Sequence, residues 1–246
     1  MSAVLFDLDG TLLDTPSAIA DTLHATLAER GRSASDARVR ATIGRPLAAS
    51  FAQLTELPED HAEVTAAVEL FRRLFREQAV PRARELVFPG IRALLEGLRD
   101  EGHQIAIVTS KIRPSAEELL KPAGLYELFH AVVCHGMAER GKPHPDLALL
   151  AARELGRGPE ACVVVGDAVD DMRMARSAGM RAVGVTYGVA TEEALHEAGA
   201  HTVVRSVDAL TAVLGTLTAA PPSATPLPAP PLSAPPPTAP PLSAPH

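Results

Sequence analysis

The first residues of the chain place two carboxylates directly after an apolar run, and this arrangement limits what the chain can fold into. Residues 3–6 read AVLF, an uninterrupted apolar run that is typical of a strand buried on both faces. Asp7 and Asp9 follow, and Gly10 comes next. Two aspartates this close to a buried strand are unfavourable unless a cation or a shared proton holds them. A strand that ends in an ordinary Asp-Gly turn is the alternative interpretation.

The composition is that of a globular protein with an acidic surface. The chain has 246 residues, 46% of them hydrophobic, and a formal net charge of −7. This charge argues against nucleic acid or an anionic membrane as the main partner. Cys134 and Cys162 lie in apolar runs and are expected in buried strands rather than in a disulfide. Since neither a signal-peptide pattern nor an apolar run of membrane-spanning length is found, we expect a cytoplasmic protein.

The rest of the chain contains a helical block followed by alternating helices and strands. Residues 15–86 read as helical throughout, with helices expected at 17–30, 36–42, 47–54 and 60–78. Later strands are expected at 104–108, 131–134, 161–165, 182–185 and 202–204. The helices between and after them are expected at 91–101, 114–120, 146–155, 169–178 and 207–217. This alternation predicts an α/β fold, with a Rossmann-like parallel sheet covered by helices on both faces.

The same patterns divide the chain into three parts. Residues 1–14 and 87–218 are expected to form the α/β core domain, and residues 15–86 an inserted, all-helical cap domain. Residues 219–246 consist mainly of Pro, Ala, Ser, Thr and Leu, and the unit APPLSAP occurs in them twice. Because such a segment cannot bury a core, we expect a disordered Pro-rich tail. A ligand for a proline-binding module is the alternative.

Polar residues gather where the expected strands end. The candidates are Asp7, Asp9 and Thr11 after the first strand, Ser110 after the second, Lys142 before the helix at 146–155, and Asp167, Asp170 and Asp171 after residues 161–165. Each group alone is compatible with a helix cap or a solvated loop. Because parallel strands end at one edge of their sheet, where such folds bind ligands, we expect these residues to form one site.

The motifs FDLDGT, VTS, GKPHPD and VVGDAVDDMRMARSAGM resemble, in order and spacing, the four motifs of the haloacid dehalogenase-like hydrolase superfamily. The resemblance covers residues 1–217. A helical insertion after the first motif, with the runs IGRPL and FPGI, is most similar to the phosphoglycolate phosphatase group. The resemblance implies a Mg²⁺-dependent phosphatase. Its substrate would be a small phosphorylated metabolite, such as a phosphoglycolate-like compound, a sugar phosphate or a nucleotide, hydrolysed through an aspartyl-phosphate intermediate.

The resemblance also implies a role for each matching residue in phosphoryl transfer. Asp7 would be the nucleophile that attacks phosphorus. Asp9 would donate a proton to the leaving oxygen and later activate the hydrolytic water. Thr11, Ser110 and Lys142 would bind the phosphoryl oxygens, where negative charge must be stabilised.

The acidic residues of the first and last motifs suit a magnesium site. The carboxylates of Asp7 and Asp167 and the main-chain carbonyl of Asp9 would hold the ion, since Mg²⁺ prefers oxygen ligands. Asp171 would support the site through water or by holding the motif lysine. The spacing of the family's motif favours Asp171 over its neighbour Asp170 for this role.

The cap is expected to set the substrate, because it closes over the phosphoryl group and excludes water. Arg45, in the loop IGRPL, is the candidate for contacting the non-phosphate part of the substrate; a solvated loop arginine is the alternative. Three further arginines, Arg72, Arg73 and Arg76, fall on one expected helix and are expected on its solvent face.

Two other functions stay open. Related phosphomutases carry a His shortly after the first motif, where this chain has Ile19, so a phosphomutase is the second candidate. A binding or regulatory protein that keeps the fold without catalysis is the third. The complete set of motif residues favours an enzyme.

Overall fold

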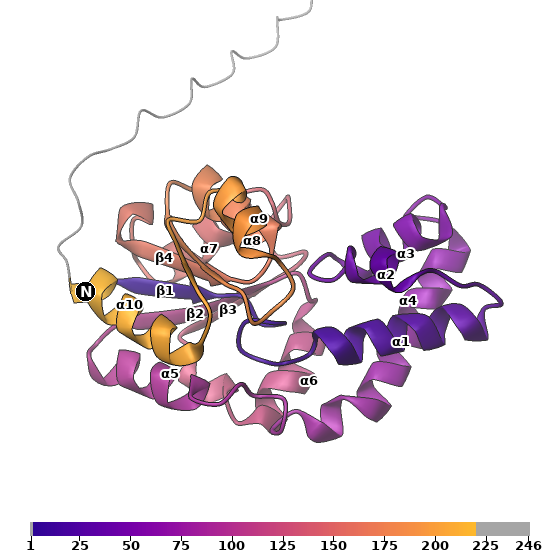
Figure 1. Cartoon of the computed structure of the whole chain (residues 1–246), viewed down its shortest axis with the longest axis horizontal. Helices are drawn as coiled ribbons and strands as arrows, with labels where there is room; N and C mark the ends of the chain where they lie inside the picture. Colours follow the sequence, from indigo (N-terminus) through magenta and orange to yellow (C-terminus); the bar gives the residue numbers. More distant parts are fainter. Residues whose placement is uncertain (1, 220–246) are drawn as a thin grey trace, which may run out of the picture.

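A parallel sheet of six strands lies at the centre of the computed structural model, which describes residues 2–219 (Figure 1). The strands are β1 (Ala3–Phe6), β2 (Gln104–Thr109), β3 (Ala131–Cys134), β4 (Cys162–Gly166), β5 (Arg181–Val185) and β6 (Thr202–Val204). Their order is β3-β2-β1-β4-β5-β6, and each neighbouring pair is parallel. The strand order reverses between β1 and β4, and the carboxyl ends of strands at such a reversal are where open α/β sheets bind ligands.

Helices cover both faces of the sheet, which confirms the predicted fold class. Side chains of a strand point alternately to opposite faces. Val4 and Phe6 of β1 pack with α5 (Ile91–Asp100), α6 (Arg113–Ala123) and α10 (Val207–Ala219). Ala3 and Leu5 pack on the opposite face with α7 (Asp146–Glu154), α8 (Val169–Ser177) and α9 (Glu192–Ala198). All four residues of β1 are fully buried, so polar chemistry is confined to the ends of the strand.

Four helices lie in the chain between β1 and the 3₁₀ turn η1 (Val80–Arg82). They are α1 (Pro16–Glu29), α2 (Asp36–Arg40), α3 (Leu47–Thr55) and α4 (Ala62–Gln78). These inserted helices lie to one side of the sheet in Figure 1. α4 contacts both α1 and α3. Phe71 of α4 stacks on Phe75 with 5.6 Å between ring centroids and meets Phe51 of α3 edge-on at 6.1 Å.

The two segments that join the inserted helices to the sheet run side by side. The backbone N–H of Asp14 donates to the carbonyl of Leu86 at 2.7 Å, and the N–H of Phe88 donates to the carbonyl of Leu12 at 3.1 Å. The insertion therefore leaves and returns at one place, close to the carboxyl end of β1.

The predicted strands are all present, and most helix ends differ from the prediction by one or two residues. α9, which covers Glu192–Ala198, is not among the predicted helices, and α6 extends three residues beyond its predicted end. α6 continues through Pro122 to Ala123 and ends at Gly124, whose φ of +71° is left-handed. Of the predicted tail, Ala219 is the last residue of α10, and residues 220–246 lie outside the described residues. Within residues 2–219, every helix is too short or too polar to cross a membrane.

Candidate active site

Three aspartates meet at the carboxyl ends of β1 and β4. Asp7 directly follows β1, Asp167 directly follows β4, and Asp171 lies in the first turn of α8. Each offers a carboxylate oxygen within 4.8 Å of those of the other two, and all three residues are buried. Asp170 is placed differently, since it lies 3.8 Å from Arg173 on the outer side of the same helix. Asp171, rather than Asp170, therefore belongs to the cluster.

A single ammonium group lies among these carboxylates. The Nζ atom of Lys142 is 2.6 Å from Oδ1 of Asp7 and 2.6 Å from Oδ1 of Asp171, and its side chain is only 4% exposed. Burial acts to lower the pKa of Lys142, but the two neighbouring carboxylates outweigh burial and raise that pKa above its ordinary value. The lysine therefore carries its charge at neutral pH.

The acidic cluster holds more negative charge than Lys142 can balance. Burial raises the pKa of Asp7 to about 7; Lys142 opposes the shift, while Asp171 and Asp9 add to it. Burial also raises the pKa of Asp167 well above its ordinary value, and the nearby carboxylates add to this effect. A buried set of oxygen donors with unbalanced charge fits a hard divalent cation.

Asp167 is held in place from two sides. The hydroxyl of Thr11 donates to its Oδ1 at 2.9 Å, and the backbone N–H of Val189 donates to its Oδ2 at 3.0 Å. Gly10, with a φ of +78°, and Gly188 both face this carboxylate so closely that a Cβ on either would overlap it. The fully buried Thr11 thus orients an acid, and this placement does not favour its predicted contact with phosphate.

Asp9 has a separate set of partners. The hydroxyl of Thr15 donates to its Oδ1 at 2.6 Å, and Nζ of Lys111 lies 3.2 Å from its Oδ2. The same Nζ lies over the ring of Phe75 at 4.8 Å from the centroid, so Lys111 contacts both the sheet side and α4. Lys111 is not among the predicted site residues, although it directly follows Ser110 at the carboxyl end of β2. This position at the end of a predicted strand is the sequence feature that could have placed Lys111 in the site.

A cavity of about 310 Å³ lies between the sheet edge and the inserted helices. The sheet side contributes Asp7, Asp9, Thr109, Ser110, Lys111 and His135, and the inserted helices contribute mainly the apolar side chains of Ile19, Leu23, Val68, Phe71 and Phe75. The Oγ atom of Ser110 is buried and has no hydrogen-bond partner among residues 2–219. A buried hydroxyl without a partner is unfavourable, so this atom is available to a ligand.

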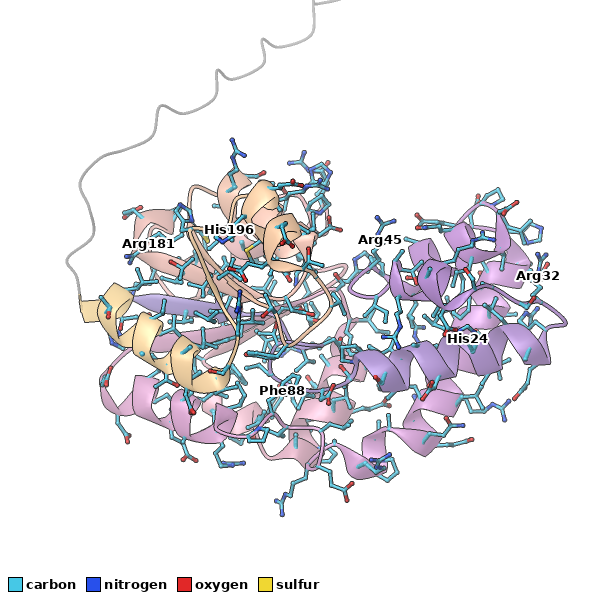
Figure 2. The ribbon with its side chains drawn as sticks, in the orientation of Figure 1. His24, Arg32, Arg45, Phe88, Arg181 and His196 are labelled. Atoms are coloured by element: carbon cyan, nitrogen blue, oxygen red, sulfur yellow. The ribbon has the colours of Figure 1, made fainter. Side chains whose placement is uncertain are left out.

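Two arginines of the insertion also line the cavity. Arg45 does so from the loop before α3, and its guanidinium donates to Oε1 of Gln53 at 2.8 Å. Figure 2 shows Arg45 on the side of the inserted helices that faces the sheet. Arg72 lines the cavity from α4, so its predicted place on the solvent face of that helix is wrong.

The spacing along α4 explains why Arg72 differs from its neighbours. It lies four residues after Val68 and one after Phe71, on the face that meets the cavity. Arg73 and Arg76 lie on other faces, where they approach Glu29 at 3.9 Å and Glu118 at 2.9 Å. Both are exposed, as the sequence predicts.

Known proteins resemble this chain over most of its length. The sequence model of the family described as haloacid dehalogenase-like hydrolase matches residues 4–185. A protein of Dickeya dadantii named probable phosphatase IndB is 42% identical over 217 residues, which cover 88% of this chain and 93% of the relative. The plasmid phosphoglycolate phosphatase of Cupriavidus necator is 33% identical over 223 residues, which cover 89% of this chain and 96% of the relative.

A solved structure agrees with these sequence relatives. The crystal structure of a predicted phosphatase from Clostridium acetobutylicum has a TM-score of 0.76 and 29% identity, and the match covers 87% of this chain and 98% of that chain. The chain therefore belongs to the haloacid dehalogenase-like hydrolase family, as its four motifs predict.

Proposed function

We propose that the chain is a Mg²⁺-dependent phosphatase that hydrolyses a small phosphomonoester through a phosphorylated Asp7. The observation that carries this proposal is the cluster of Asp7, Asp167 and Asp171 around Lys142, which reaches the cavity through Asp7. The similarity to proteins named phosphatases supports the reaction class.

The first half-reaction transfers the phosphoryl group to Asp7. A carboxylate oxygen of Asp7 attacks phosphorus while the bond from phosphorus to the ester oxygen breaks. Asp9 gives a proton to the departing oxygen, so the product leaves as an alcohol. Lys142 and the free hydroxyl of Ser110 stabilise the charge on the phosphoryl oxygens. Lys111, whose Nζ lies 3.2 Å from Oδ2 of Asp9, and the hydrogen bond from Thr15 hold Asp9 in position for this transfer.

The second half-reaction releases phosphate. Asp9, now deprotonated, takes a proton from a water molecule whose oxygen attacks phosphorus. The bond between phosphorus and Asp7 breaks, so inorganic phosphate leaves and both carboxylates return to their starting states.

Magnesium completes the site in this proposal. The carboxylates of Asp7 and Asp167 and the main-chain carbonyl of Asp9 would hold the ion, and Asp171 would support it by fixing Lys142. When bound, Mg²⁺ neutralises the acids and stabilises the charge that develops on the transferring group. The fit rests on the three buried oxygen donors and on the raised pKa values of Asp7 and Asp167.

The inserted helices act in this proposal as a cap. Residues 1–14 and 87–218 form the core domain, and residues 15–86 close the cavity over the substrate and exclude water. Arg45 contacts the non-phosphate part of the substrate. Ile19 lines the cavity where a related phosphomutase carries a His, and this apolar side chain favours hydrolysis over mutase chemistry.

Release of phosphate from p-nitrophenyl phosphate tests the proposal, with Mg²⁺ and with EDTA. We expect Asp7→Asn to lower kcat by about 1,000-fold or more, because the amide is a poor nucleophile. Asp170→Asn is the matched control; its carboxylate faces Arg173 outside the cluster, so we expect a change of about twofold or less. Activity of Asp7→Asn equal to that of the wild type, or equal rates with Mg²⁺ and EDTA, would contradict the mechanism.

A further inference from the structure

Arg72 is a charged residue on the apolar face of an amphipathic helix. Val68, Phe71, Arg72 and Phe75 of α4 all line the cavity, at the i, i+3, i+4 and i+7 spacing of one helix face. The side chain of Arg72 is half-buried, and its Nε atom is removed from water, which is unfavourable unless that atom has a specific partner. The other face residues are apolar and buried.

The guanidinium of Arg72 lacks a partner within the described part of the chain. Its Nε atom is buried and makes no hydrogen bond to any of residues 2–219, and no carboxylate of those residues lies within ion-pair distance. Glu118 also lines the cavity, but its carboxylate is already paired with Arg76 at 2.9 Å. Because a buried N–H without an acceptor is unfavourable, an acceptor supplied by a ligand explains the arrangement.

Arg72 and the acids line the cavity from different elements of the fold. Asp7 and Asp9 line it from the sheet side, where the proposed phosphoryl transfer takes place. Arg72 lines it from α4. The volume of about 310 Å³ is at the low end of small-molecule sites, so a ligand that contacts both Asp7 and Arg72 is a small metabolite.

We propose that Arg72 binds an anionic group on the leaving part of the substrate. The substrates are then small phosphomonoesters that carry a carboxylate or a second phosphate, because the planar guanidinium pairs with both groups through two parallel hydrogen bonds. This inference rests on the proposed function, which places the phosphoryl group of the substrate at Asp7.

Three phosphate esters test the role of Arg72. p-Nitrophenyl phosphate has no second anion, 2-phosphoglycolate carries a carboxylate, and glucose 1,6-bisphosphate carries a second phosphate. For the doubly anionic ester that the wild type hydrolyses with the higher kcat/KM, we expect Arg72→Met to lower kcat/KM by about 30-fold or more. For the aryl phosphate, we expect the same substitution to lower kcat/KM by about threefold or less. Arg72→Lys should keep part of the preference for the doubly anionic ester over the aryl phosphate, because lysine retains the positive charge but lacks the planar guanidinium.

The matched control is Arg73→Met, which removes an exposed arginine from the next position of the same helix. It is expected to leave all three kcat/KM values within about twofold of the wild type. Equal losses for all three esters in Arg72→Met would assign Arg72 a structural role and overturn the proposal. The ester whose kcat/KM falls more in Arg72→Met identifies whether the second anion is a carboxylate or a phosphate.

A binding measurement separates this inference from the proposed function. Calorimetric titration of 2-phosphoglycolate and of glucose 1,6-bisphosphate into Asp7→Asn, with and without Arg72→Met, needs no turnover. We expect the second substitution to weaken binding of the recognised ester by about tenfold or more. If each ester binds equally well with and without Arg72→Met, or if neither ester binds, the inference about Arg72 is overturned. If an ester binds tightly through Arg72 but the wild type does not hydrolyse it, the inference about Arg72 holds and only the phosphatase proposal is refuted.

Discussion

Replacing Lys142 by Met should make the stability of the metal-free protein strongly dependent on pH. The substitution keeps a side chain of similar length and removes the one cation of the acidic cluster. Lys142 lies 2.6 Å from both Asp7 and Asp171 and is nearly inaccessible to water. Breaking a buried ion pair by removing one partner typically costs about 3–5 kcal/mol, because the remaining charge is left unpaired.

Proton uptake limits this loss at low pH. The folded-state pKa of Asp7 is about 7, above the ordinary value of 3.8, so the folded protein binds more protons than the unfolded chain between these values. Stability therefore falls as pH rises through that window. Without Lys142, one further carboxyl of the cluster has to take up a proton in the folded state, and neutralising it costs about 6 kcal/mol at pH 8 and about 2 kcal/mol at pH 5.5. The deficit of Lys142→Met should then be about 3–5 kcal/mol near pH 8 and at most about 2 kcal/mol near pH 5.5.

Urea unfolding followed by far-ultraviolet circular dichroism measures this deficit, since the chain has no Trp for fluorescence. EDTA is present throughout, so that no divalent ion replaces the lysine. Lys121→Met is the control, because Lys121 forms a solvent-exposed pair with Glu117 at 2.7 Å, so its replacement should change the stability little at either pH. A deficit for Lys142→Met below about 1 kcal/mol near pH 8, or one that is equal at both pH values, would refute this reasoning.

Two further substitutions examine the surroundings of the acids. Lys111→Met removes the cation beside Asp9 and should lower kcat by about 10- to 100-fold in steady-state assays; an unchanged kcat would rule out a role in positioning that carboxylate. Gly188→Ala introduces a Cβ that overlaps the carboxylate of Asp167 and should weaken Mg²⁺ binding by about tenfold or more in calorimetric titration. Gly97→Ala, with no atom within 4 Å of its added Cβ, should bind Mg²⁺ as the wild type does, and equal affinities for all three proteins would contradict the close packing around Asp167.

The sheet was predictable from sequence because its strands are short, continuous apolar runs with polar residues at their carboxyl ends. β1, β3 and β6 have the predicted bounds, and the other strands differ by a residue at one or both ends. α9 was not predictable in the same way. Its seven residues bury only Leu195 and Ala198, so the segment has no apolar stripe that the helical period could reveal.

The candidate site was predictable as a group of residues but not in its individual contacts. Parallel strands end at one edge, so the acids of β1 and β4 had to lie close together. The individual contacts of each polar side chain depend on the backbone conformation of the turns, which the sequence pattern does not specify. The left-handed Gly10 places Thr11 against Asp167 instead of in the cavity. For Arg72 the signal was present, because the spacing from Val68 places it on the apolar face of its helix.

The burial that makes the sheet stable also explains why the site carries unbalanced charge. β1 and β4 are buried along their whole length, so polar groups needed for chemistry can only follow the last strand residue. Asp7 and Asp167 therefore leave water together with the strands that they follow, and their pKa values rise. One lysine supplied from the loop before α7 balances part of this charge. The remaining charge opposes folding above neutral pH and favours a divalent cation, so the same acids weaken the fold and define the site.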